Sequence, residues 1–236
     1  MRWWITDLKR GLTEPSFFLA LVIGCLGMVG AVAFYIIRHE IYTATEVFKG
    51  SHALVIPFIA PLLCALPYAN MNMLETDCGY KKFLLLRNKG RNYTLKRWWV
   101  NSFIGGITLL LPSLLLMVVC RSFSTYEDVK GILEVVGLNF FFGVTYSSLA
   151  YSLTFVNKKR YIPLLGPQVL YLLFIYAFPY LKLEKFFPPL TFSPWIMPDL
   201  VNLQLMIIQL SVLLGISFLI IGCGDLFRKG VTKWLQ

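Results

Sequence analysis

The residues of this sequence that could carry out chemistry fall mostly outside its long apolar segments. His39 and His52 lie in one predicted connection between such segments, and their spacing makes no metal-ligand pair. No Gly-x-Ser-x-Gly, His-Glu-x-x-His, paired-carboxylate or Walker A motif occurs. The five cysteines include no Cys-x-x-Cys pair. The sequence therefore predicts no catalytic residue, no bound cofactor and no metal site in this chain.

Several uncharged polar side chains lie inside the apolar segments, where polar groups need partners. The candidates for lining a path through the membrane are Asn70, Asn101, Asn139, Gln168 and Gln209. Amides at such depth can also join neighbouring helices by hydrogen bonds, and for most of them this role is the one we favour.

The most distinctive polar segment runs from Glu75 to Trp98. It is too charged to cross a bilayer, yet the run Phe83-Leu-Leu-Leu86 is too apolar for a disordered loop. Asn88-Lys-Gly90 is typical of a turn, so we expect a short helix, a turn and then an amphipathic lead into the next span. The leucine run favours a docking surface for a protein partner over a basic loop that lies on anionic lipid.

The elements that must position these residues are membrane helices. The chain has 236 residues, 57% of them hydrophobic and 14% charged, with a mean hydropathy of +0.67. A soluble domain carries about a quarter charged residues, so most of this surface must face lipid. Six apolar segments have the roughly 20 residues that a spanning helix needs. The predicted spans are 17–37, 53–74, 99–120, 135–156, 162–181 and 203–223. We expect an all-α membrane protein with one transmembrane domain over residues 1–236.

Basic residues predict the orientation. Most of the 22 Lys and Arg residues fall in the N-terminus, the 75–98 segment, the connection after the fourth span and the C-terminus, whereas the opposite connections hold only six. The positive-inside rule therefore places both termini in the cytoplasm. This topology also accounts for the net charge of +10, so no nucleic-acid partner is predicted.

Two further segments flank the spans. Residues 2–14 place apolar side chains such as Ile5 and Leu8 on one helical face, which predicts an amphipathic helix in the membrane interface. This helix could simply anchor the chain, or it could dock specifically. Residues 182–202 are rich in proline and aromatic residues, so we expect an irregular segment of short helices or turns at the outer interface.

This layout resembles the membrane subunit of a type 2 ABC exporter. The local likeness lies in Glu75-x-x-x-Gly79-Tyr80, then Leu84-Leu85-Leu-Arg87, then Arg91-x-Tyr93-x-x-Lys96. In that family a similar pattern forms a coupling helix that docks into the nucleotide-binding subunit. The compact chain is most similar to small permeases of Gram-positive bacteria that export peptides or confer immunity to bacteriocins.

The resemblance implies a permease in the bacterial cell membrane that moves an amphipathic peptide or a lipid-like molecule. ATP and Mg²⁺ would be bound and ATP hydrolysed by separate cytoplasmic ABC ATPase subunits, so this chain would not itself be an enzyme. A second permease copy or a paralogue would complete the transport unit within the lipid.

Two alternatives come from other classes. The first is a membrane-embedded enzyme of lipid metabolism with an interfacial site among Glu75, Asp77 and Asp225. The absence of ionisable residues from the predicted span cores counts against it. The second is a structural or chaperone-like membrane protein without a transport role, which would show no ATP-coupled change.

Overall fold

The computed structural model of the chain describes residues 2–38, 43–87, 93–123, 126, 128–157, 159–196 and 203–234. These residues form helices and connections without a strand, which confirms the all-α prediction. The elements are α1 (Arg2–Thr13), α2 (Pro15–Arg38), α3 (Ala44–Ala65), α4 (Met71–Asp77), α5 (Tyr80–Arg87), α6 (Tyr93–Arg121), α7 (Val129–Val156), α8 (Tyr161–Tyr180), the 3₁₀ helices η1 (Glu184–Phe186), η2 (Pro188–Thr191) and η3 (Pro194–Ile196), and α9 (Leu203–Trp234).

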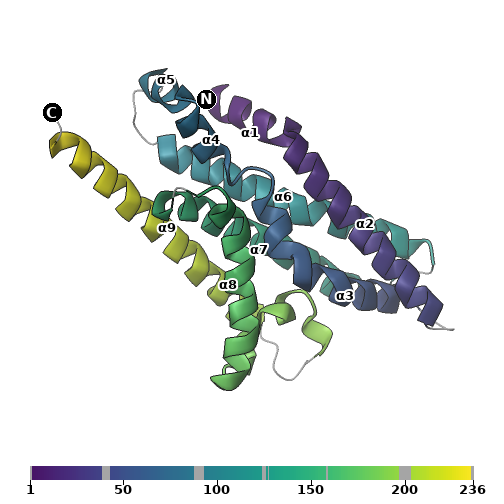
Figure 1. The fold of residues 1–236 in the computed structure, drawn as a ribbon. Coiled ribbons are helices and arrows are strands. Elements are labelled where there is room, and N and C mark those ends of the chain that lie inside the picture. The colour runs from purple at the N-terminus through teal and green to yellow at the C-terminus, as the bar shows by residue number, and fades with distance from the viewer. Residues whose placement is uncertain are drawn as a thin grey trace.

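Six helices are long and apolar enough to cross a membrane, as expected of a multi-pass membrane protein. They are α2, α3, α6, α7, α8 and α9. Figure 1 shows α1, α4 and α5 gathered at one end of these helices, near the start of the chain, with the C-terminal end of α9 also at the top of the view.

The second membrane helix differs most from its prediction. The sequence predicts one span over 53–74, whereas α3 covers Ala44–Ala65 and the short α4 follows after a turn. Thr43 explains the early start. Its hydroxyl accepts a hydrogen bond from the N–H of Glu46 at 3.3 Å, and the Glu46 carboxylate accepts one from the N–H of Thr43 at 2.9 Å, which forms a capping box. At its other end, α3 stops at Ala65, and a turn over residues 66–70 leads into α4.

This shift moves His52 from the predicted outer connection into α3, where it is completely buried, so that prediction was wrong. Nδ1 of His52 lies 2.9 Å from the carbonyl of Phe192, and Nδ2 of Asn139 lies 2.6 Å from Nε2. Because a carbonyl cannot donate, Nδ1 carries the proton and the imidazole is neutral. Asn139 also donates to Oγ of Ser113 at 2.8 Å. We call His52, Ser113, Asn139 and Phe192 the His52 network; it joins α3, α6 and α7 to the segment after η2.

Helices α6 and α7 form the most extensive pair of the bundle. Glycines make the close approach possible, because a Cβ on Gly105 would collide with the side chain of Ser147 and one on Gly143 would collide with the carbonyl of Gly105. Asn101 donates from Nδ2 to the carbonyl of Ser147 at 2.6 Å across this interface. The pair forms the centre against which α3 and α9 pack.

The predicted irregular segment 182–202 is described as far as Ile196 and contains η1, η2 and η3; residues 197–202 lie outside the described part. Phe192 is completely buried, and its ring lies 4.5 Å from that of Phe142 on α7. The segment is therefore packed into the bundle by its aromatic residues.

Candidate functional site

The clearest polar site of the chain lies where α1, α4 and α6 meet. Its buried members are two acids, two tyrosines and one arginine, and a second arginine lies at the rim. We call these residues the charge cluster: Asp7, Arg10, Tyr68, Glu75, Tyr93 and Arg97.

Arg97 and Glu75 form the centre of the charge cluster. Both side chains are buried, with exposed fractions of 0% and 3%. The guanidinium contacts both carboxylate oxygens, through Nη1 to Oε2 and through Nη2 to Oε1 at 2.7 Å, so the pair is bidentate. Tyr93 lies one helical turn before Arg97; its hydroxyl donates to Oε2 of Glu75 at 3.0 Å and accepts from Nη1 of Arg97.

The same arginine also reaches α1 through a tyrosine. Nη2 of Arg97 donates to the hydroxyl of Tyr68 at 2.8 Å, and that hydroxyl donates to Oδ1 of Asp7 at 2.8 Å. Nε of Arg97 lies 3.4 Å from Oδ2 of Asp7. Arg10 adds a second contact from α1, with Nη1 2.7 Å from Oε1 of Glu75. The Glu75 carboxylate is thus held by α6 through both oxygens and by α1 through Oε1.

The cluster is electrostatically balanced, with two carboxylates and two guanidinium groups. Burial alone raises the pKa of Glu75, but the hydrogen bonds and positive charge of Arg97, with the Tyr93 hydroxyl and Arg10, outweigh it and hold the pKa below its ordinary value. Burial also raises the pKa of the Tyr68 hydroxyl, which stays protonated and donates to Asp7. The cluster therefore fixes α4 to α1 and α6 through ionic contacts. Removing either partner of the buried pair would leave an uncompensated charge.

Two more contacts hold α4 against the opposite side of the bundle. Nδ2 of Asn72 donates to the hydroxyl of Thr154 on α7 at 3.0 Å; the same side chain accepts from Nζ of Lys81 on α5 at 2.6 Å, which ties α5 to α4. At the surface, Nη2 of Arg160 lies 2.6 Å from Oδ2 of Asp77. Helix α4 is thus tied to α1 and α6 on one side and to α7 and the α7–α8 connection on the other.

Helix α5 follows α4 through a sharp turn at Gly79, whose φ of +71° lies in the left-handed region that favours glycine. Beyond this turn, Phe83 and Tyr80 present large apolar side chains to the surroundings, with exposed fractions of 69% and 47%. Leu84 is half-buried. Helix α4 is thus firmly held by its contacts, and helix α5 presents an exposed aromatic surface.

The predicted coupling residues divide between the charge cluster, the turn at Gly79 and helix α5. Glu75 and Tyr93 belong to the charge cluster, Gly79 forms the turn, and Tyr80 and Leu84 lie on α5. The prediction also named residues of which less is described: Leu85 and Arg87 belong to α5, Arg91 lies outside the described residues, and Lys96 is exposed on the first turn of α6.

The five predicted amides lie apart, and four of them make hydrogen bonds between elements. Besides Asn101 and Asn139, Gln168 on α8 donates to the carbonyl of Phe58 on α3 at 2.8 Å, and Gln209 on α9 donates to that of Phe186 in η1 at 3.1 Å. Asn70 lies in the turn before α4, where its carbonyl accepts from the N–H of Leu74 at 3.0 Å. These contacts fit the helix-joining alternative.

Sequence reasoning missed Asp7, Arg10, Tyr68 and Arg97 as site residues. Arg97 was assigned to the loop because the third span was predicted to begin at residue 99, whereas α6 begins at Tyr93. The spacing of four residues between Tyr93 and Arg97, next to a long apolar helix, was the available signal that both lie on one helix face. Nothing in the sequence indicated that Asp7 would meet them.

Two of the carboxylates named for an interfacial enzyme, Glu75 and Asp77, pair with different arginines. Glu75 is held by Arg97 and Arg10, and Asp77 pairs with Arg160 at the surface. Asp225 belongs to α9, and its side chain lies outside the described part. Among the described residues, no group of three or more His, Cys, Asp and Glu side chains is arranged to hold a metal ion.

Comparison of the chain with protein-family models, with curated proteins and with solved structures finds no match.

Proposed function

We propose that this chain is the membrane-spanning permease subunit of an ATP-driven exporter of the ABC type, and that α4 and α5 form its coupling element. The observation that carries the proposal is the combination of Phe83, 69% exposed on α5, with the buried charge cluster that fixes the preceding helix α4. An exposed aromatic surface on α5, next to the firmly held helix α4, is suited to bind a partner protein and to pass that protein's movement to the bundle.

The distribution of basic residues supports a cytoplasmic position for this surface. Helices α4 and α5 lie in the connection with the most Lys and Arg residues, and the N-terminus, the α7–α8 connection and the C-terminus are also basic. With six crossings, both termini then lie in the cytoplasm. Helix α1 would lie at the cytoplasmic membrane interface, where Asp7 and Arg10 connect it to Arg97 and Glu75.

Coupling follows physically from this arrangement. Closure of the ATPase subunits around ATP would displace α5, and the hydrogen bonds of α4 would pass the displacement to α6, α7 and α1 together. ATP and Mg²⁺ would be held by the ATPase, and this chain would carry no catalytic residue. A second copy or a paralogue would form the other half of the transport unit in the cell membrane.

The proposed cargo is an amphipathic peptide or a lipid-like molecule. The described side chains of the membrane helices are mostly apolar, and many of the polar ones are hydrogen-bonded to one another, as in the His52 network. Such walls are a poor route for a small ion and suit a cargo with apolar surface of its own.

Affinity purification of the full chain from its own cells tests the proposal. We expect a cytoplasmic ATPase to co-purify with the native chain and to be reduced at least tenfold with Phe83→Asp, since an exposed aromatic anchor often contributes about 2 kcal/mol or more to binding. Tyr161→Asp is the matched control, because Tyr161 is an aromatic residue of α8 with a similar exposure, 54%, next to the α7–α8 connection at the same end of the bundle.

All three proteins must elute as single species of the same size for the comparison to count. An ATPase retained equally by Phe83→Asp and the native chain would contradict the coupling role of α5. No ATPase with the native chain would contradict the permease proposal itself.

A further inference from the structure

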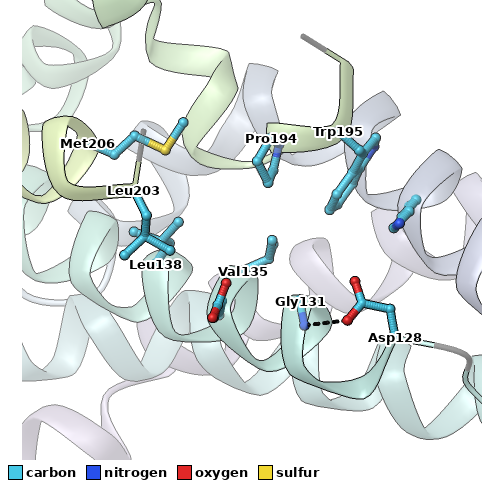
Figure 2. Close-up of a pocket in the computed structure, with 10 residues that line it drawn as sticks. Asp128, Gly131, Val135, Leu138, Pro194, Trp195, Leu203 and Met206 are labelled. Carbon is cyan, nitrogen blue, oxygen red and sulfur yellow. Dashed lines mark hydrogen bonds between the residues drawn. The ribbon is translucent and has the colours of Figure 1, made fainter. Parts of the chain in front are cut away.

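A cavity of about 270 Å³ lies at the end of the bundle opposite the charge cluster, where α7 begins. Figure 2 shows Trp195 and Pro194 of η3 above the cavity, Val135 of α7 below it, and Met206 of α9 at the upper left. With Lys49 of α3, the cavity is therefore lined by four elements that lie far apart in the sequence.

Both signs of charge line this cavity. Lys49 on α3 extends its ammonium group over the ring of Trp195, 5.7 Å from the centroid. Asp128 is occupied as the helix cap of α7, since Oδ1 accepts from the N–H of Gly131 at 2.9 Å (Figure 2). Glu134 is exposed and has no ion-pair or hydrogen-bond partner within the described part of the chain. The cavity thus offers one ammonium group and one unengaged carboxylate.

A second cavity, of about 300 Å³, continues the first between α7 and α9. The two share Glu134, Leu138 and Leu203, and the second extends past Gly137 and Phe141. Its lining is almost entirely apolar apart from Glu134, and both helices belong to the six that can span the membrane. Together the cavities form a groove, charged at the end of the membrane helices and apolar along them.

We propose that this groove binds a phospholipid whose headgroup carries a primary ammonium group, a phosphoethanolamine. The phosphate pairs with Lys49, the ammonium group donates to Glu134 and faces Trp195, and an acyl chain fills the apolar part beside Gly137. An anionic headgroup without an amine would face Glu134 with like charge, and a purely cationic amphiphile would face Lys49 with like charge. A trimethylammonium group cannot donate a hydrogen bond to Glu134. The proposal stands independently of the permease function.

Native mass spectrometry of the detergent-solubilised full chain tests it with three lipids of identical acyl chains, bearing phosphoethanolamine, phosphocholine or phosphoglycerol headgroups. We expect the phosphoethanolamine lipid to be retained about fivefold more than the phosphoglycerol lipid, in line with one exposed charge pair. Glu134→Gln should remove this preference. Lys49→Gln should lower the retention of all three lipids.

Gly137→Leu tests the acyl part of the groove, because a Cβ added there meets no atom within 4 Å and the larger side chain would occupy the space proposed for the acyl chain. We expect it to lower the retention of all three lipids. Gly30→Leu on α2 is the matched control, since Gly30 is an equally open helical position outside the groove.

Three results would overturn the proposal. The first is equal retention of the phosphoglycerol and phosphoethanolamine lipids by the native chain. The second is equal lipid retention by the Gly137→Leu and Gly30→Leu variants. The third is displacement of the lipid by a cationic amphipathic peptide of Lys and Leu that binds more tightly to Lys49→Gln, which would identify a peptide site.

Discussion

The two ends of the helix bundle both contain buried polar networks, and they are built from different chemistry. The charge cluster joins Glu75 and Arg97 as ions and reaches α1 through Tyr68 and Asp7. The His52 network uses a neutral imidazole, an amide and a hydroxyl. Neutral hydrogen bonds suffice to join spanning helices to the outer segment. A helix of seven residues such as α4 has little apolar surface to bury, so charges help to hold it.

The largest expected effect follows from removing one member of the ion pair. Glu75→Ala leaves the guanidinium of Arg97 buried without its main partner, and we expect the free energy of unfolding to fall by about 3–5 kcal/mol. SDS-titrated unfolding in detergent micelles measures this. Arg97→Met completes a double-mutant cycle, in which the double variant should lose less than the sum of the single losses by more than about 1 kcal/mol. Additive losses would show that the two side chains act separately.

A smaller loss is expected at the neutral end. His52→Leu leaves the carbonyl of Phe192 without its donor and removes an acceptor from Asn139, at a cost of about 1–3 kcal/mol. Adding Asn139→Leu should recover part of the loss, because replacing both partners leaves fewer unsatisfied groups. The same unfolding titration compares the two variants. A loss as large as that of Glu75→Ala would erase the proposed difference between the two ends.

Acid weakens the charge cluster through Glu75. The pKa of Glu75 in the folded chain lies below its value in the unfolded chain, so the carboxylate stabilises the fold above the unfolded value of about 4.3. That contribution is lost as the pH falls below this value and through the folded pKa. Unfolding titrations from pH 7 to pH 3 should show a steeper decline for the native chain than for Glu75→Gln. Equal slopes for the native chain and Glu75→Gln would exclude Glu75 as the group responsible.

The smallest effect is expected where the charges are exposed. Arg160 and Asp77 pair at 2.6 Å with more than half of each side chain accessible. Such pairs contribute about 0.2–1 kcal/mol and weaken in salt. Arg160→Ala should therefore lower the unfolding free energy slightly at low salt and leave it unchanged at high salt. A salt-independent loss comparable to that of His52→Leu would mean that burial does not determine how strongly α4 is held.

The sequence predicted the repeated pattern of apolar segments well and the long-range polar contacts poorly. Six runs of apolar residues correspond to the six long helices because length and hydropathy are local properties. The start of α3 was missed because Thr43 and Glu46 lie outside the apolar run. Glu75 and Tyr93 were named from a local pattern, whereas Asp7 lies 90 residues before Arg97 and meets it only through tertiary packing. The exposure of Phe83 likewise depends on how α5 is placed, which no local pattern specifies.

The central claim, that α4 and α5 form a cytoplasmic docking surface, can be tested directly at Cys78. This residue is exposed between α4 and α5, so a variant with the other four cysteines replaced by alanine carries one reporter thiol. A membrane-impermeant maleimide should leave Cys78 unlabelled in intact cells and label it in inside-out vesicles. Vesicles that keep their peripheral proteins should be labelled more slowly than washed ones. Labelling of Cys78 in intact cells would place α4 and α5 outside the cytoplasm and contradict the account.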